Sequence, residues 1–591
     1  MRHRKDRKRS DWEALCEGVA KVWEAGGEVD WRAFREGRTT RRVVLPVYPF
    51  ERKRCWPVDD VAQTGGTENQ RPPERKLPWQ ERFYVPSLRR TSAPVEFVAA
   101  GNQNWVVVDG GTDLGAAVTL ALRARGHDVE CVAEISAQPA SETELRVLWL
   151  WPLSEAGDGL ARLMGLAREL IALRRTVQLF VLVSEGQTAM LGPLLSLTQE
   201  VPTIVTRMIS VGDGVQASDI VAECGAAVPR REPLVVLRRG VRWVERFDQI
   251  SLGEAQRVAG ERRLAAGPHI ITGGLGRIGH ALGRHLATLG ADVVLVTRSA
   301  RDIDDDCGGK ISVVRADVSK AGEIDRVFAE CLVRHGRIGG VFHAAGQAMI
   351  EEIRDVTAAS LAEELAPKVA GTEFVAHAIS KLDAYRRPDF VMAFSSLAAS
   401  LGGLGLGSYA AANRSMDAFV AGQPVRDGVP WFSVGWDDWD FDYGGQQMGA
   451  YSQTRAALSI APEEGFAAMA AILGEPGLHR VLVSATDLDA RIERWGKRSA
   501  AEAVSARADA PASGGDGLSI AEKRVRTAYV RVLGGLPGLD DDFFALGGDS
   551  LLATQIVLEL SDADLRIADV FDFPSIRALS QRMLNTAKDA L

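Results

Sequence analysis

A chain of 591 residues exceeds one compact domain, since domains average about 150 residues, and has room for about four. Hydrophobic residues make up 46% and charged residues 25% of the chain, which excludes wholesale disorder and fibrous repeats. The formal net charge of −8 argues against nucleic acid as the main partner.

The first predicted element is a helix over residues 10–26. A capping box formed by Ser10 and Glu13 marks its start, and a glycine marks its end. The chain then becomes extended and rich in proline, glycine and charge. We therefore assign residues 1–57 to an N-terminal segment and residues 58–80 to a linker.

The middle of the chain contains an internal repeat. Residues 105–129 and 269–293 share one plan, in which a β-branched strand, a glycine turn and an apolar-striped helix lead through Gly-x-Asp-Val into a second strand. Each copy opens a βαβ unit, so we predict an α/β protein with tandem Rossmann-like subdomains over residues 81–250 and 251–498. The first copy lacks the glycine that the second has at Gly276, so we expect the first subdomain to be degenerate.

The second copy carries a nucleotide-binding pattern, Gly274-x-Gly276-x-x-Gly279, between a strand and a helix. Glycine permits the tight turn and lets backbone N–H groups approach a pyrophosphate at the helix N-terminus. A glycine turn that merely packs is the alternative. The next strand ends in Arg298 and Ser299, where an NAD-selective site more often has an acidic residue, so this end favours the 2′-phosphate of NADPH.

Asp317 and Val318 close the following strand. They are candidates for binding the adenine amino group, although an aspartate before a helix is equally an ordinary cap. Residues 390–413 carry no charge and are long enough to cross a bilayer, but glycines and hydroxyls interrupt them. We read this stretch as strand, loop and helix and expect no membrane contact.

Four polar side chains behind the nucleotide loop fit the needs of carbonyl reduction. That reaction requires a proton donor for the developing alkoxide and groups that stabilise its charge, roles that suit Tyr409 and Ser396. A tyrosine needs a nearby cation, here Lys368 together with an oxidised nicotinamide, to lower its pKa from about 10. Asn413 stands one helical turn beyond Tyr409. Ser396 and Tyr409 alone would also fit a polar junction of strand and helix.

These residues resemble those of the ketoreductase domains of modular polyketide synthases, a branch of the short-chain dehydrogenase/reductase superfamily. Simple members of the superfamily have Tyr-x-x-x-Lys, whereas these ketoreductases have Tyr-x-x-x-Asn and carry the lysine on an earlier helix. Tyr409, Asn413 and Lys368 match the second form. The resemblance covers residues 82–496 and implies that the first subdomain is structural and the second catalytic.

The resemblance implies a role for each residue. Tyr409 is the proton donor and Ser396 orients the carbonyl. Lys368 tunes the tyrosine and holds the ribose, and Asn413 supports the lysine or its water. The cofactor-binding residues implied by motif and resemblance are Thr272, Gly273, Gly274, Leu275, Gly276, Ile278, Gly279, Arg298, Ser299, Asp317, Val318, Ala344, Ala345 and Gly346.

The resemblance leaves the product configuration open. Members that give one hydroxyl configuration usually have Leu-Asp-Asp after the His-Ala-Ala-Gly motif, where this chain has Ala348, Met349 and Ile350. Members that give the other usually have a tryptophan where this chain has Leu401.

A small C-terminal domain follows a second linker at residues 499–517. Residues 518–588 have the size of a four-helix bundle, with a first helix at 520–533. The string Asp-Phe-Phe-x-Leu-Gly-Gly-Asp-Ser550-Leu resembles the attachment motif of acyl and peptidyl carrier proteins. It implies a 4′-phosphopantetheine arm on Ser550, at the positive end of a helix. A serine that only caps this helix is the alternative.

The extended stretch at residues 43–56 looks like the tail of the linker that follows an acyltransferase in the same synthases, which assigns residues 1–57 to that linker. The resemblance implies as partners an acyl chain on the chain's own carrier, ketosynthase and acyltransferase domains, and a phosphopantetheinyl transferase. The six cysteines are scattered without metal-ligand spacing, so we expect no metal, reduced thiols and a cytoplasmic location.

Together these features predict NADPH-dependent reduction of a β-ketoacyl thioester during polyketide biosynthesis, and two alternatives remain. In the first, the reductase fold is inert and the chain is a carrier and scaffold module, because both stereochemical motifs are missing. In the second, the substrate is an α-keto acyl chain on a hybrid peptide–polyketide line, because the Gly-Gly-Asp-Ser motif occurs in both kinds of carrier.

Overall fold

The computed structural model describes most of the chain. The described residues are 10–24, 27, 29–34, 75–92, 103–109, 111–133, 135, 144–150, 158–225, 232–299, 308–346, 348–441, 459–475, 477–496, 519–533, 537–543, 553, 556–557, 559–560 and 565–589. The attachment residue Ser550, the extended stretch at 43–56 and the linker at 499–517 lie outside them, as does most of the linker at 58–80.

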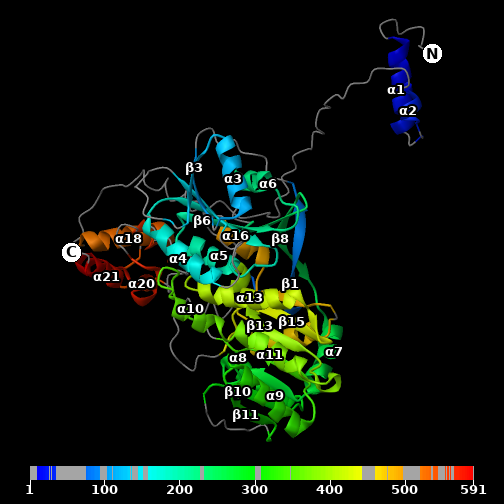
Figure 1. Cartoon of the computed structure of the whole chain (residues 1–591), viewed down its shortest axis with the longest axis vertical. Helices are drawn as coiled ribbons and strands as arrows, with labels where there is room; N and C mark the ends of the chain where they lie inside the picture. The colour runs from blue at the N-terminus through cyan, green and yellow to red at the C-terminus, as the bar shows by residue number, and fades with distance from the viewer. Residues whose placement is uncertain are drawn as a thin grey trace, which may run out of the picture. The chain divides into compact units, whose positions relative to one another are not determined.

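The chain forms two compact units, Met1–Pro72 and Pro73–Leu591. In the first unit, α1 (Asp11–Glu24) and α2 (Trp31–Phe34) are drawn in dark blue in Figure 1. The predicted capping box is confirmed, because Ser10 N donates to Glu13 Oε2 at 2.8 Å and Glu13 N donates to Ser10 Oγ at 3.2 Å. The ring of Trp12 stacks on that of Phe34 with centroids 5.2 Å apart.

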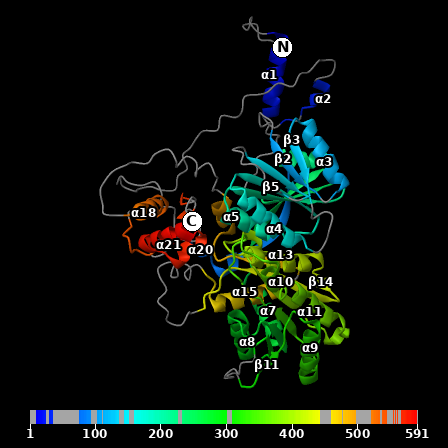
Figure 2. The ribbon, with the colours of Figure 1, turned by 60° about the vertical axis from the view of Figure 1, so that its left-hand side comes forward.

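In the second unit, one continuous sheet joins the two Rossmann-like halves, which follow one another along it in Figure 2. We call residues 81–250 the structural half and residues 251–498 the catalytic half, after their predicted roles. The catalytic half contributes parallel strands in the order β11 (Ile311–Arg315), β10 (Val293–Thr297), β9 (His269–Thr272), β12 (Gly340–His343), β13 (Val391–Ser396), β15 (Val429–Trp436) and β16 (Arg480–Val483). The structural half contributes β7 (Leu234–Arg238), β6 (Ile204–Val211), β5 (Val177–Ser184), β4 (Leu145–Trp149), β2 (Asn104–Val108) and β3 (Asp128–Val132). The predicted tandem α/β architecture is thereby confirmed.

Two long antiparallel strands form the seam between the halves. β1 (Phe83–Thr91) pairs with β16 on one side and along its whole length with β8 (Val241–Ile250) on the other. The last strand of the structural half, β8, ends at Ile250, where the sequence predicts the end of the first subdomain. The boundaries themselves stay predictions, because one sheet runs through both halves.

Helices cover both faces of this sheet. Successive side chains of a strand point to opposite faces, and both faces carry apolar residues that need to be buried. On one face of the catalytic half, α7 (Glu254–Ala265), α8 (Arg277–Thr288) and α15 (Pro462–Leu473) cover Ile271 and Leu295. On the other, α9 (Ala321–His335), α11 (Ala370–Ser380) and α13 (Gly407–Gly422) cover Ile270 and Val294. The structural half has α3 (Asp113–Ala124) and α6 (Ala217–Gly225) on one face and α4 (Gly159–Ala172) and α5 (Leu191–Glu200) on the other.

The uncharged stretch at residues 390–413 folds as expected, into β13, the short α12 (Ala398–Leu401) and the first turns of α13. Over the residues that the structure describes, no helix is long and apolar enough to span a bilayer. The same part of the chain contains no group of three or more His, Cys, Asp and Glu side chains suited to hold a metal ion.

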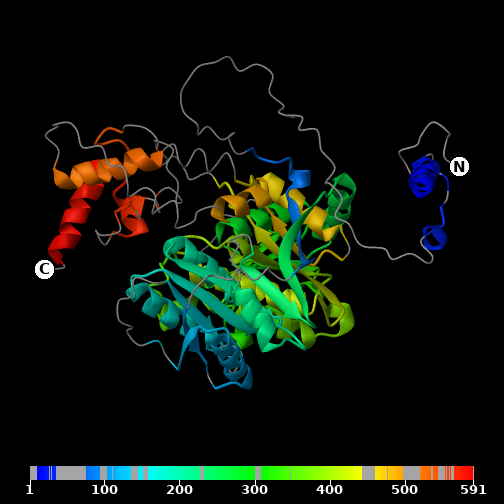
Figure 3. The same cartoon turned by 90° about the horizontal axis from the view of Figure 1, so that it is seen from above.

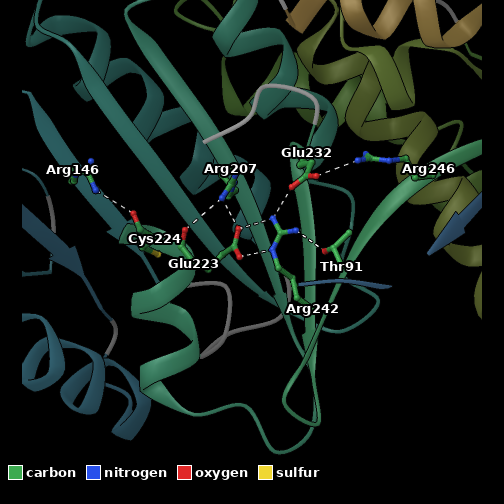
Figure 4. Close-up of polar contacts among 8 residues, drawn as sticks. All are labelled: Thr91, Arg146, Arg207, Glu223, Cys224, Glu232, Arg242 and Arg246. Atoms are coloured by element: carbon green, nitrogen blue, oxygen red, sulfur yellow. Dashed lines mark hydrogen bonds and ion pairs between the residues drawn. The ribbon is translucent and has the colours of Figure 1, made fainter. Parts of the chain in front are cut away.

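A buried ionic network stabilises the structural half (Figure 4). The Glu223 side chain is 1% exposed and pairs with Arg207, and its Oε2 accepts from Arg242 Nε at 2.7 Å. Arg242 Nη2 also donates to Glu232 Oε2 at 2.7 Å. Removing one member of a buried pair leaves an uncompensated charge, which usually costs about 3–5 kcal/mol.

We therefore expect Glu223→Ala to lower the free energy of unfolding by about 3–5 kcal/mol, measured by urea denaturation. Glu185→Gln is the matched control, because Glu185 forms a half-exposed pair with Arg238 at 3.1 Å, and such pairs contribute about 0–1 kcal/mol. Equal unfolding midpoints for the two variants would contradict the stabilising role of the network.

The C-terminal domain contains α18 (Ile520–Leu533), α20 (Ile567–Asp572) and α21 (Ile576–Asp589). The predicted first helix is confirmed. In Figure 3, α18 in orange crosses α21 in red. Their shared core includes Val525, Tyr529, Ile556 and Leu579. The four-helix count stays a prediction, because the described residues between 537 and 565 are discontinuous.

Candidate active site

The glycine loop connects β9 to α8 and fits tightly against neighbouring backbone. Gly273 has φ +67°, and a Cβ built on it would lie 2.8 Å from the carbonyl oxygen of Ala344. A Cβ on Gly279 would overlap the carbonyl oxygen of Gly273. Both positions therefore require glycine, one for its φ and close approach and the other for close approach alone.

The same loop fits a dinucleotide at its open side. Gly276 is the N-cap of α8, and a Cβ on it would meet one chain atom within 4 Å, the carbonyl oxygen of Gly273 at 3.1 Å. The space beside Gly276 is thus free of side chains, and it lies at the N-terminus of α8, where backbone N–H groups favour an anion. This combination suits a pyrophosphate, as the pattern predicts.

The ends of β9 and β12 are bound to each other beside this loop. Thr272 Oγ1 lies 2.8 Å from His343 Nδ1 and accepts from Ala345 N at 3.3 Å. Gly346 follows with φ +135°, and a Cβ on it would lie 2.7 Å from Lys368 Cε. The predicted cofactor residues of β12 therefore connect the glycine loop directly to the predicted catalytic lysine.

The predicted ribose and adenine contacts differ in their surroundings. Arg298 and Ser299 are exposed just beyond β10, whose Val296 O accepts from Gly274 N at 2.9 Å. Asp317 Oδ1 accepts from Ser319 N at 3.0 Å and from Ser319 Oγ at 2.6 Å. Asp317 is therefore engaged in a local turn, and it does not cap α9, whose N-cap is Lys320. Its neighbour Val318 is 6% exposed and belongs to the core, so an adenine contact of either residue stays a prediction.

The structure brings the four predicted catalytic residues together from three segments. Ser396 ends β13, Tyr409 lies in the first turn of α13 with Asn413 one turn later, and Lys368 lies between α10 (Ala358–Leu365) and α11. Lys368 Nζ is 5.9 Å from the ring centroid of Tyr409 and donates to Phe394 O at 2.8 Å. The lysine and the tyrosine therefore lie on the same side of the site.

Asn413 is fully buried and holds the first turn of α13. Its Nδ2 donates to Tyr409 O at 2.8 Å, and its Oδ1 has no hydrogen-bond partner among the described residues. A buried carbonyl oxygen without a partner is a position where water is expected. Asn413 does not bond to Lys368 directly, so of its two expected roles the one through water fits the geometry better.

Burial dominates the titration of both central groups. It lowers the pKa of Lys368 to about 8, although Asp417 and Glu364 act in the opposite direction. Burial also raises the pKa of Tyr409, while the side chains of Asn413 and Ser396 act to lower it. We expected cations to lower the pKa of Tyr409, and the structure differs. Of the two expected cations only Lys368 belongs to the chain, and a phenolate away from water is costly.

Glu364, which no sequence motif singled out, is 4% exposed in the last turn of α10, four residues before Lys368. Its Oε2 accepts from Met349 N at 2.9 Å, and burial raises the pKa of its carboxyl to about 7. The available signal was its nearness in sequence to Lys368, four residues away across the end of α10. Glu364 thereby joins the lysine segment to the loop that follows Gly346.

A glycine loop after β9 and a Ser–Tyr–Lys–Asn set behind it are typical of short-chain dehydrogenases/reductases. Residues 267–440 match the KR domain family, and residues 523–583 match the phosphopantetheine attachment site family. The chain therefore contains a KR domain and a carrier domain, and in this it is similar to part of modular polyketide synthases.

Curated relatives and solved structures agree. The chain is 33% identical over 240 residues to polyketide synthase GfsA of Streptomyces halstedii, covering 39% of this chain and 3% of that one. It is 27% identical over 506 residues to erythronolide synthase EryA3 of Saccharopolyspora erythraea, covering 80% and 15%. A structure of A-type ketoreductases from a modular polyketide synthase matches with a TM-score of 0.58 at 21% identity, covering 73% of this chain and all of that one. The chain thus spans a small part of the curated relatives it matches.

Proposed function

We propose that the chain reduces the β-keto group of an acyl thioester carried on a 4′-phosphopantetheine arm at Ser550, with NADPH as reductant. The placement of Lys368 Nζ 5.9 Å from the Tyr409 ring, beside the loop at Gly346, is the observation that carries the proposal. It puts a proton donor and a cation next to the residues that fit a dinucleotide.

NADPH, when bound at the glycine loop, supplies the hydride that goes to the β-carbon. Tyr409 gives the proton of its hydroxyl to the ketone oxygen, so that ketone, hydride and proton together yield the alcohol. Ser396 orients and stabilises that oxygen by donating a hydrogen bond. The positive charge of Lys368 stabilises the phenolate that Tyr409 becomes, and a water at Asn413 Oδ1 is the route by which its proton returns.

The exposed Arg298 beyond β10 supports NADPH over NADH, because a guanidinium matches a phosphate. Arg298→Ala should raise the KM for NADPH about tenfold and leave the KM for NADH nearly unchanged, measured by initial rates with each cofactor. Arg337→Ala is the control. Arg337 is a half-exposed arginine that pairs with Asp389 at 2.8 Å, and it precedes the first residue of β12, whereas the predicted cofactor residues follow the last. An equal rise in both KM values would show that Arg298 does not recognise the 2′-phosphate.

An acyl chain attached to the chain's own carrier would be present at a high effective concentration near the active site. It would therefore need little intrinsic affinity for that site. The match to the phosphopantetheine attachment family supports this arrangement, and we propose a phosphopantetheinyl transferase as the partner that attaches the arm. Ketosynthase and acyltransferase domains are proposed as further partners, because the curated relatives are polyketide synthases. Free cysteines among the described residues, namely Cys16, Cys131, Cys224 and Cys331, support the proposed cytoplasmic location.

Paired assays with diffusible thioesters test the proposal. A β-ketoacyl thioester should be reduced faster than an α-ketoacyl thioester of equal length, with the loss of reduced nicotinamide absorbance as readout. Faster turnover of the α-keto compound would favour a hybrid peptide–polyketide substrate. Turnover of neither compound would favour an inert scaffold.

A further inference from the structure

Helix α5 of the structural half ends at Glu200, whose carboxylate reaches two loops of the catalytic half. Glu200 Oε2 accepts from Ile353 N at 2.8 Å, and Glu200 Oε1 accepts from Gly405 N at 3.0 Å. These two backbone donors are far apart in the chain. One side chain of the structural half therefore ties together two separate segments of the catalytic half.

Both segments border the candidate active site. The first follows the cofactor residues at Gly346 and leads through Ile353 to α10 and Lys368. The second joins α12 to α13, and Gly405 lies in it just before Tyr409. The segments are also bonded to each other, because Glu351 N donates to Gly405 O at 2.9 Å. A shift of either segment would move a group that the proposed chemistry needs.

Apolar packing continues from α5 into the same segments. Ile353 and Leu361 are buried in one core with Leu194 and Leu197 of α5. A Cβ on Gly192 of α5 would lie 2.6 Å from the Ala410 Cβ, so α5 lies directly against the helix that carries Tyr409. This close packing leaves little freedom for the loops to rearrange around a changed side chain at position 200.

Burying the Glu200 carboxyl group costs free energy, which its two hydrogen bonds to backbone N–H groups offset in part. Burial raises the pKa of its carboxyl to about 8, and the neighbouring charges are those of Glu352 and Arg354, which pair with each other at 3.0 Å. Filling this position with an apolar side chain would avoid the desolvation of a carboxylate but would leave the N–H groups of Ile353 and Gly405 without their acceptor. The two oxygens of the Glu200 side chain therefore match these two donors, one oxygen for each N–H group.

The segment that leads from Gly346 to Ile353 also carries exposed apolar side chains. Ile350 is 82% exposed and Met349 is 36% exposed, and a Cβ on Gly405 would lie 2.8 Å from Ile350 Cγ2. Exposed apolar groups beside a reducing centre suit contact with an acyl chain. The position of these side chains relative to Tyr409 depends on the two hydrogen bonds that Glu200 accepts from Ile353 N and Gly405 N.

We infer that Glu200 is a positioning residue for the acyl substrate, acting from the structural half by fixing the adjoining loops at Ile353 and Gly405, which lead to Lys368 and Tyr409. The inference rests on the proposed reduction of a β-ketoacyl thioester. Glu200 touches neither substrate nor cofactor in this role. It sets where the ketone lies relative to the proton donor.

The test compares Glu200→Gln and Glu200→Ala with the wild type and with Glu185→Gln, an exposed carboxylate of the same half. The two N–H groups bond to different oxygens of Glu200, so in glutamine one of them would face the NH2 group, and alanine offers no acceptor to either. We expect kcat/KM for a diffusible β-ketoacyl thioester to fall about 10- to 100-fold, because misplacement by ~1 Å has effects of that size. The KM for NADPH should stay unchanged, and amide exchange of peptides covering residues 348–356 and 402–406 should accelerate. Glu185→Gln should match the wild type in every readout.

Two outcomes would overturn the inference. One is unchanged turnover and unchanged exchange in both Glu200 variants. The other is a loss of NADPH affinity in proportion to the loss of turnover, which would mark Glu200 as a general stabilising residue. A wild type that reduces no thioester would instead refute the proposed function, and the exchange measurement would still show whether Glu200 holds the two loops.

Discussion

Tyr409→Phe should lower kcat for ketone reduction by roughly 100- to 10,000-fold, the range in which a positioned general acid contributes. The substitution removes only the hydroxyl, so the ring keeps its place 5.9 Å from Lys368 Nζ and α13 keeps its contacts. The affinity for NADPH should change little, because the glycine loop at residues 273–279 belongs to a different segment. Stopped assays with the diffusible thioester and a fluorescence titration with NADPH measure the two quantities.

The control for this prediction is Tyr385→Phe, because the side chain of Tyr385 is 75% exposed in a short turn before β13. That variant should keep the wild-type rate. A Tyr409→Phe enzyme with the wild-type kcat would show that another group supplies the proton. Glu364, buried one turn before Lys368, would then be the next candidate.

Ser550→Ala should abolish attachment of phosphopantetheine entirely. A phosphodiester to the chain requires the hydroxyl oxygen, and the attachment family match at residues 523–583 includes this serine. Intact-mass measurement after incubation with a phosphopantetheinyl transferase and coenzyme A should show one added arm on the wild type and none on the variant.

Ser519→Ala is the matched control for the carrier, because Ser519 is a serine of the same domain that precedes α18, where its Oγ accepts from Glu522 N at 3.2 Å. The control should take the arm normally. Addition of an arm to Ser550→Ala would contradict the assignment. Loss of the arm in both variants would indicate that the domain fails to fold rather than that Ser550 is the acceptor.

The local features of the fold could be predicted from the sequence because they depend on short-range patterns. The capping box of Ser10 and Glu13 lies within one helical turn. The glycine loop is recognisable because Gly273 and Gly279 must each lack a side chain where the backbone passes close. The proximity of Lys368 to Tyr409 came from the resemblance rather than from spacing, since no local pattern connects them.

The contacts that the sequence could not predict depend on how distant segments meet. Glu200 bonds to backbone donors at Ile353 and Gly405, and no periodicity of α5 indicates that its last residue is buried in another subdomain. The seam of β1 and β8 joins strands from opposite ends of the structural half. The direction of the Tyr409 pKa shift could not be predicted from the sequence either, because it depends on how deeply the folded chain buries the hydroxyl.

The most direct test of the account is the fate of deuterium from NADPH labelled at the hydride position. The wild-type chain, incubated with this cofactor and a diffusible β-ketoacyl thioester, should yield a β-hydroxyacyl thioester with one deuterium on its β-carbon, seen by mass spectrometry. An unchanged thioester, from a chain that binds NADPH and accepts the arm on Ser550, would contradict the account and leave only the carrier function.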